Sequence, residues 1–113
     1  MRLTILELPA RWNAAERTLT DVDAALRDRE TDLVLLPEAS LHGYVSPAGD
    51  ADLTSFAEPI DGPTSRACAA LAANHRVHLV APLVLREVAL HNAMVCHAPD
   101  GTRPFVYRKR HPW

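Results

Sequence analysis

Apolar residues recur along the chain in two patterns, and each pattern predicts one kind of secondary structure. Short apolar runs that end at proline, glycine or charged residues predict strands, whereas apolar residues three and four positions apart predict helices with one buried face. The first pattern covers residues 2–8, 33–36, 77–85, 91–98 and 103–109. The second predicts helices near residues 14–28 and 63–75. The order strand, helix, strand is typical of an α/β layer architecture.

The starts of both helices carry local signals. Asn13 followed by Glu16 predicts an N-cap whose carboxylate partner reaches back from the first turn. Asp61 and Gly62 precede Pro63, which suits the first turn of a helix. We expect the inward faces to hold Ala15, Leu19, Val22 and Leu26 in the first helix and Ala67, Leu71 and Ala72 in the second.

The remaining segments predict how the strands are covered and connected. Residues 33–36 are apolar on both faces, as expected for a strand covered on two sides in a parallel or mixed sheet. Residues 46–61 predict a loop with a short helical turn at 53–56. Asp100-Gly101 predicts a hairpin turn with a positive φ at both positions. The sequence stops after the fifth strand with no helix to cover it, so we expect a fragment of a larger domain.

Composition narrows the class of protein. A chain of 113 residues with 48% hydrophobic content fits one small globular domain or a piece of a larger one. The formal net charge is −2 and the basic residues are scattered apart from Arg108, Lys109 and Arg110, which argues against nucleic acid as a partner. No stretch has membrane-spanning length and none resembles an export signal, so we expect a soluble, cytoplasmic protein without a membrane partner.

Glu38 is the first candidate for chemistry. Pro37 cannot continue a central hydrogen-bond ladder, so it ends the predicted strand and places Glu38 at the carboxyl end, where ligands bind in open α/β sheets. Partial burial among Ala39 and Leu41 would raise the pKa of Glu38 toward the range of a general base. The alternative, which spacing alone favours, is an exposed glutamate in a loop or one that caps the next turn.

Lys109 is the second candidate. It is the only lysine among the 12 basic residues and follows the last predicted strand. Its compact ammonium, with three donors, could stabilise a developing oxyanion. A planar guanidinium does so less adaptably. The alternative, an exposed basic cluster at a strand end, is at least equally compatible with the spacing.

Histidine and cysteine give weaker signals. His75 and His78 have a ligand-like spacing, but a predicted change from helix to strand separates them and no Cys-x-x-Cys context supports a metal. Cys68 and Cys96 lie inside predicted elements without an export signal, so we expect reduced core thiols rather than nucleophiles or a disulfide.

Two stretches together resemble the nitrilase superfamily of carbon-nitrogen hydrolases. "LVLLPEASLHGY" is similar to the first catalytic motif of that family, and "NAMVCHAPDGTRPFVYRKRHPW" is similar to the second. The motifs occur in the family's order, and the resemblance extends from Arg2 to Trp113. It implies the N-terminal half of an α-β-β-α sandwich, with residues 1–113 forming a partial carbon-nitrogen hydrolase domain.

The resemblance also implies a chemistry. Glu38 would be the general base that takes a proton from a cysteine thiol, and Lys109 would stabilise the tetrahedral intermediate formed on an amide, nitrile or carbamoyl carbon. The resemblance implies no metal or organic cofactor, a small-molecule substrate, and a homo-oligomer when the domain is complete.

The sequence departs from the family in ways that affect activity. The nucleophilic cysteine and a second glutamate lie downstream of the lysine in the family, beyond this sequence, so the chain alone is expected to be inactive. Glu7 stands where a glutamine is frequent, and Pro112 where a leucine is frequent. The competing hypothesis is a truncated, non-catalytic relative that docks onto a complete homologue. A membrane-embedded acyltransferase of the superfamily is disfavoured, because no segment spans a membrane.

Overall fold

The computed structural model describes residues 1–110, so the expectation about Pro112 and the last residues of the second motif lie outside it. Every element expected from the sequence is present among these residues. They are β1 (Leu3–Ile5), α1 (Ala15–Leu26), β2 (Leu33–Leu35), the 3-10 turn η1 (Thr54–Phe56), α2 (Pro63–His75), β3 (His78–Arg86), β4 (Leu90–His97) and β5 (Val106–Arg108). β1 and β5 are shorter than the expected ranges 2–8 and 103–109. Within residues 1–110, neither helix is long and apolar enough to cross a membrane.

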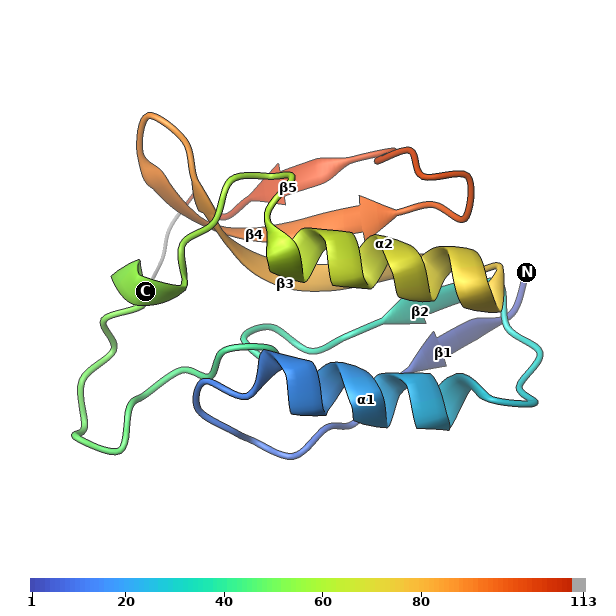
Figure 1. Cartoon of the computed structure of the whole chain (residues 1–113), viewed down its shortest axis with the longest axis horizontal. Helices are drawn as coiled ribbons and strands as arrows, with labels where there is room; N and C mark the ends of the chain where they lie inside the picture. Colours follow the sequence, from blue (N-terminus) through green and yellow to red (C-terminus); the bar gives the residue numbers. More distant parts are fainter. Residues whose placement is uncertain (111–113) are drawn as a thin grey trace.

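Within residues 1–110 the strands form one five-stranded sheet in the order β1-β2-β3-β4-β5. β1, β2 and β3 are parallel, so α1 and α2 form the crossovers between them. β4 and β5 are added as antiparallel neighbours. Figure 1 shows α1 and α2 side by side on the same face of the sheet. The predicted α/β class is therefore confirmed, as one mixed sheet with a helical layer on one face.

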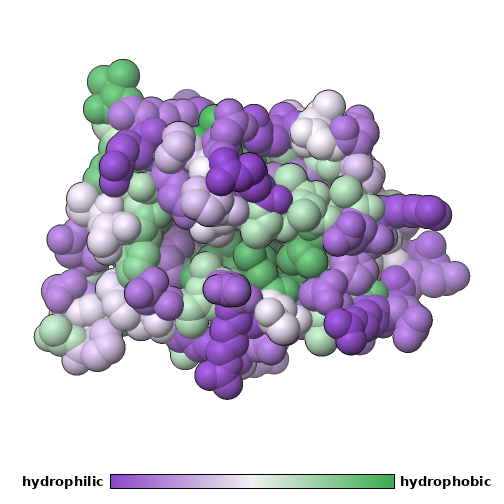
Figure 2. All heavy atoms as spheres, viewed as in Figure 1, coloured by the Kyte–Doolittle hydropathy of each residue, from purple (hydrophilic) through white to green (hydrophobic). Residues whose placement is uncertain are grey.

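The core lies between that helical layer and the sheet. One face of α1 and one of α2 pack on alternate residues of the strands, which gives the cluster Leu19, Val22, Leu26, Val34, Cys68, Leu71, Ala72, Leu79, Ala81, Leu83, Leu85, Ala93 and Val95. The prediction for Ala67 was wrong, because this residue is exposed and Cys68 is buried instead. Ala67 lines a groove between the two helices, where Figure 2 shows apolar side chains between polar ones.

Two predictions about turns also need correction. Asn13 is not the N-cap of α1: it has φ +50° and donates its backbone N–H to the His42 carbonyl at 3.1 Å, and Ala14 takes the cap position without a side-chain bond. In the hairpin between β4 and β5, only Gly101 has a positive φ, +86°. Its N–H donates to the Ala98 carbonyl at 3.1 Å, so the chain turns through Pro99 and Asp100 before glycine takes the left-handed position.

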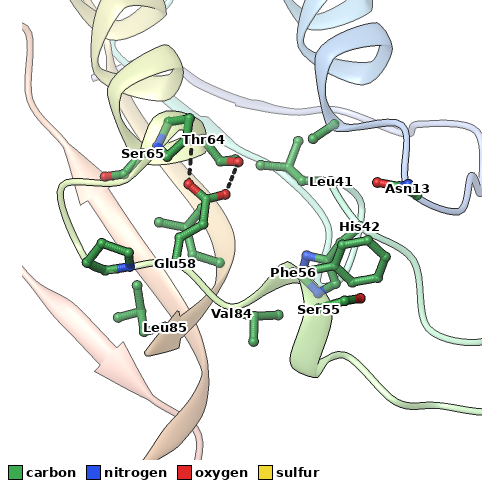
Figure 3. A pocket seen from close by; sticks show the side chains of 14 residues that line it. Asn13, Leu41, His42, Ser55, Phe56, Glu58, Thr64, Ser65, Val84 and Leu85 are labelled. Atoms are coloured by element: carbon green, nitrogen blue, oxygen red, sulfur yellow. Dashed lines mark hydrogen bonds between the residues drawn. The ribbon is translucent and has the colours of Figure 1, made fainter. Parts of the chain in front are cut away.

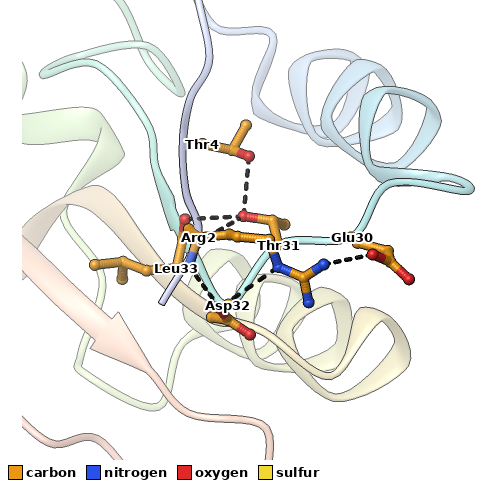
Figure 4. A network of polar contacts seen from close by, with 6 residues as sticks. All are labelled: Arg2, Thr4, Glu30, Thr31, Asp32 and Leu33. Atoms are coloured by element: carbon orange, nitrogen blue, oxygen red, sulfur yellow. Dashed lines mark hydrogen bonds and ion pairs between the residues drawn. The ribbon is translucent and has the colours of Figure 1, made fainter.

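A polar network fixes the start of β1 beside β2 (Figure 4). The Arg2 backbone N–H donates to the Asp32 carboxylate at 2.5 Å, and the Arg2 guanidinium pairs with Glu30, also at 2.5 Å. The Thr4 hydroxyl donates to the Thr31 hydroxyl at 2.9 Å. These contacts hold the short edge strand in register although it has few ladder bonds.

The other face of the sheet carries no helix within residues 1–110 and is largely apolar. The strand pairing aligns Ile5, Leu35, Val80 and Cys96 in one row across it. At the two edges, Leu3 is 51%, Ile5 69% and Tyr107 55% exposed. We call this surface the open face. Because Glu38 meets its partners here, the open face is where the candidate site lies.

Candidate active site

The local sequence places Glu38 at the carboxyl end of β2, as predicted. The Leu36 N–H still donates to the Val80 carbonyl at 3.0 Å, and Pro37 then ends the ladder. Ala39, the next residue, has φ +59° and turns the chain away from the sheet. The side chain of Glu38 is left 35% exposed beside the open face.

The fold brings the two candidate residues together across 71 positions of sequence. Lys109 follows β5, and its ammonium Nζ lies 2.8 Å from Glu38 Oε1. Both side chains are about one third exposed, at 29% for Lys109 and 35% for Glu38. The alternative of an exposed basic cluster does not describe Lys109, because its ammonium is partly buried and paired with a carboxylate.

Two residues without a role in the sequence analysis complete the site. Asn92, on β4, donates its Nδ2 amide to Glu38 Oε1 at 2.8 Å. Tyr44, in the loop after β2, donates its hydroxyl to Glu38 Oε2 at 3.2 Å. Both lie inside the stretches that resemble the family motifs, but only the folded chain shows that they contact Glu38. Glu38 thus receives donors from a loop, an inner strand and the end of β5.

The electrostatics differ from the expectation for Glu38. Its pKa lies below the ordinary value, mainly because Lys109 donates a hydrogen bond to the charged form, and Tyr44 and Asn92 act in the same direction. Partial burial raises the pKa but is outweighed. The prediction of a raised pKa was wrong, because it considered apolar neighbours and not a cation from a distant strand. Glu38 is ionised at neutral pH.

Two cavities meet at Glu38. One of about 170 Å³ is lined by Glu38, Asn92, Met94, Tyr107 and Lys109 together with Ala93. The other, of about 550 Å³, runs from Glu38 past Tyr44 to Trp12. A small molecule between them would have a carboxylate, an ammonium and an apolar wall within reach. A site of this composition can move a proton and stabilise negative charge.

A third cavity, of about 290 Å³, lies elsewhere and contains neither Glu38 nor Lys109 (Figure 3). It is lined by Leu41, His42, Phe56 and Glu58 among others, near the start of α2. His42 Nε2 and Ser65 Oγ are buried there without a partner among the described residues. Ordered water would satisfy both atoms.

Neither cysteine is placed to work with Glu38. Cys68 is fully buried on α2, on the helix side of the sheet, and burial raises the pKa of its thiol to about 12. Cys96 is 3% exposed and burial raises its pKa as well. It lies four positions from Asn92 along β4, roughly 13 Å in a strand. The prediction that both are core thiols is confirmed by their burial.

The histidines have separate environments. His75 Nε2 lies 2.8 Å from the Asp23 carboxylate, and His91 Nε2 lies 3.4 Å from Glu87. His97 is buried on β4, and within the described residues neither of its ring nitrogens has a partner. Across residues 1–110, no three potential ligands among histidine, cysteine, aspartate and glutamate are close enough to hold a metal ion.

Glu38 and Lys109, the two residues to which the family resemblance gives a role, lie 2.8 Å apart at one end of the mixed α/β sheet. The chain belongs to the carbon-nitrogen hydrolase family, whose sequence profile matches residues 3–113. No curated protein sequence matches the chain significantly.

Solved structures support the fold. A CN-hydrolase superfamily protein from Xanthomonas campestris is 26% identical over 100% of this chain and 42% of its own, with a TM-score of 0.82. A carbon-nitrogen hydrolase from Helicobacter pylori is 23% identical over 98% and 40%, with a TM-score of 0.79. An N-terminal amidase with an Asn-Glu-Ala peptide is 17% identical over 100% and 29%, with a TM-score of 0.84. The chain thus spans less than half the length of these structures and corresponds to a portion of their fold.

Proposed function

We propose that the protein to which this chain belongs hydrolyses a carbon–nitrogen bond in a small-molecule amide, nitrile or carbamoyl compound. Membership of the carbon-nitrogen hydrolase family supports this type of reaction in general. For this chain, the main support for the proposal is the contact of 2.8 Å between Lys109 Nζ and Glu38 Oε1 at the end of β2. No metal or organic cofactor takes part in the proposed reaction.

Glu38 acts as the general base and Lys109 as the oxyanion stabiliser. Because its pKa is lowered, Glu38 is present as a carboxylate at neutral pH and can accept a thiol proton. The ammonium of Lys109 lies beside it, where it can stabilise the oxyanion that forms when the thiolate attacks the substrate carbon. The thiol comes from a cysteine outside residues 1–113, since Cys68 and Cys96 are buried away from Glu38. The chain alone is therefore inactive.

A second candidate function is supported by the open face. Its exposed apolar residues Leu3, Ile5 and Tyr107 would suit a non-catalytic chain that docks on a complete homologue. In that case the chain forms a stable complex with such a homologue, and mutation of Glu38 or Lys109 changes no activity.

The first testable prediction concerns Glu38→Gln and Lys109→Ala. The chain is expressed with the coding sequence that follows residue 113, and ammonia release is measured from amides, nitriles and N-carbamoyl compounds. We expect Glu38→Gln to lower kcat by about 10²- to 10⁴-fold, as for loss of a general base. We expect Lys109→Ala to lower it by about 10²- to 10³-fold, as for loss of one oxyanion donor.

Matched controls come from a neighbouring ion pair. Arg108 Nη2 lies 2.5 Å from the Glu87 carboxylate, and neither residue contacts Glu38. Glu87→Gln and Arg108→Ala therefore remove the same types of charge from the same sheet and should leave kcat nearly unchanged. Full activity of either site variant, or no hydrolysis of any of the three substrate classes, would contradict the proposal.

A further inference from the structure

The two oxygens of the Glu38 carboxylate have different surroundings. Oε1 accepts from Lys109 Nζ and from Asn92 Nδ2, each at 2.8 Å. Oε2 accepts, among residues 1–110, from the Tyr44 hydroxyl, at the longer distance of 3.2 Å. The Lys109 bond is charge-assisted from both sides, which makes it the strongest type of hydrogen bond in the site. The carboxylate is thus held firmly at one oxygen and loosely at the other.

This asymmetry decides which oxygen can receive a proton. Each carboxylate oxygen has about two lone-pair sites in the plane of the group. At Oε1 both sites are filled by donors, whereas Oε2 has room for one more. We propose, on the basis of the function proposed above, that Oε2 is the oxygen that receives the thiol proton, and that Asn92 is the positioning residue that keeps Oε1 turned toward Lys109.

Asn92 is suited to this role because it holds both partners. Its side chain donates to Glu38, and its backbone carbonyl accepts the N–H of Lys109 at 2.8 Å. It lies on β4, an inner strand, where it pairs with Val84 of β3. Tyr44 lies in a loop and is 45% exposed. The rigid contact therefore comes from Asn92, and the adaptable contact is the one at the reacting oxygen.

The proton and the electron pairs balance in the proposed step. The S–H bond of the downstream cysteine breaks, its proton moves to Glu38 Oε2, and the sulfur electron pair forms the bond to the substrate carbon. The π electrons of the substrate carbonyl move to its oxygen, next to Lys109. When the C–N bond of an amide breaks, the leaving nitrogen takes the proton back from Oε2, so Glu38 returns to the carboxylate.

The first measurement needs no catalysis. The pKa of Glu38 is measured by carbon-13 NMR of its carboxyl group in the chain of residues 1–113. The variants are Asn92→Ala and the isosteric Asn92→Asp. The control is Asn74→Ala, on the exposed side of α2. We expect the pKa to rise in Asn92→Ala because a donor to the charged form is lost, and to rise further in Asn92→Asp because a second negative charge is added. Amide spectra show whether each variant is folded. A Glu38 pKa that stays unchanged in the folded Asn92 variants would overturn the positioning role.

The second measurement tests the choice of oxygen, in the extended active protein. If Oε2 is the acceptor, Asn92→Ala lets the carboxylate turn and lowers kcat by about 10- to 100-fold. The acid limb of the pH profile of kcat then moves to higher pH, and KM changes little. If Oε1 were the acceptor, the same variant would free a site on it and kcat would be kept or increased, which overturns the assignment. If the wild-type protein is inactive but the Glu38 pKa changes in the Asn92 variants, the proposed function is refuted and the positioning role of Asn92 remains.

Discussion

At the scale of single residues, the low pKa of Glu38 sets a condition on its proposed role as a base. A carboxylate that receives three hydrogen bonds is ionised but holds a proton weakly. In the proposed reaction, the negative charge that develops on the substrate oxygen would attract Lys109 and weaken its hydrogen bond to Oε1. The proton affinity of Glu38 would then rise as the thiol of the proposed reaction loses its proton. Pairing the base with the oxyanion stabiliser thus links the two proposed roles.

His97 gives a prediction for the pH dependence of stability. It is 1% exposed, and burial, aided by the nearby Arg103 charge, lowers its pKa to about 4. An unfolded histidine titrates near pH 6.5, so below that pH the unfolded chain binds a proton that the folded chain does not. The free energy of unfolding should therefore fall by about 2 kcal/mol between pH 6.5 and 5 and be independent of this group above pH 7. The buried His42, whose pKa burial also lowers, acts in the same direction.

Urea titrations at pH 7 and pH 5 test this dependence. His97→Leu should reduce the difference in unfolding free energy between the two pH values. The control His78→Gln changes an exposed histidine at the start of β3 and should leave the difference as in the wild type. An undiminished pH dependence in His97→Leu would show that His97 is protonated in the folded chain.

At the scale of secondary structure, Glu58 stabilises the start of α2. Its carboxylate accepts the Thr64 backbone N–H at 2.9 Å and also the Thr64 hydroxyl. The N-cap residue, Gly62, has no side chain, and a Cβ there would lie 2.5 Å from Glu58 Oε1. Glu58 therefore occupies the place of an N-cap side chain, and its negative charge lies at the positive end of the helix dipole.

We expect Glu58→Ala to lower the free energy of unfolding by about 1 to 2 kcal/mol, the usual range for loss of a cap. Gly62→Ala should also destabilise the chain, because its methyl group displaces the carboxylate. The control is Glu16→Ala, because Glu16 lies in the first turn of α1 and forms no capping box, since Asn13 is not the cap. Equal losses in Glu58→Ala and Glu16→Ala, measured by urea unfolding, would contradict a specific role for the Thr64 contacts.

The elements show what local sequence can and cannot predict. The Gly62-Pro63 start of α2 was predicted correctly because those signals act within one turn. Asn13 failed as a cap because a long-range bond to the His42 carbonyl fixes its backbone. Pro82 lies within β3 although proline interrupts a ladder. Pro82 is tolerated because its nitrogen, which has no hydrogen to donate, points to the side of β3 where β2 has already ended.

The same distinction applies to the candidate site. Pro37 predicts the end of β2, so the position of Glu38 could be predicted from the neighbouring residues alone. Its pKa could not, because Lys109 and Asn92 are 71 and 54 positions away in sequence. Only the pairing of β4 with β3 and of β5 with β4 brings them to Glu38. Residue types along one strand predict which side chains are present at a site, whereas strand order decides which of them touch.

At the scale of the whole molecule, the sheet is covered unequally. The helices bury one face. On the open face, Ile5 is exposed and Leu35 is partly buried, whereas Val80 and Cys96 of the same aligned row are buried. Its edges expose Leu3, Ile5 and Tyr107 by half or more. Apolar side chains exposed at the edges of a sheet can mark an interaction site. The matched structures are more than twice as long as this chain, which agrees with a face that is covered in a larger assembly or a longer protein.

The last prediction follows from that face. The folded chain of residues 1–113 should bind the dye ANS, because the open face offers apolar surface to water. Ile5→Ser and Tyr107→Ser, singly and together, should lower the dye fluorescence while the near-ultraviolet circular dichroism shows that the fold is kept. The control Val88→Ser removes a fully exposed apolar side chain from the turn between β3 and β4, away from the open face, and should leave the fluorescence unchanged. A folded wild-type chain that binds no dye would show that the open face is covered in solution, whereas equal losses in all three single variants would place the dye elsewhere.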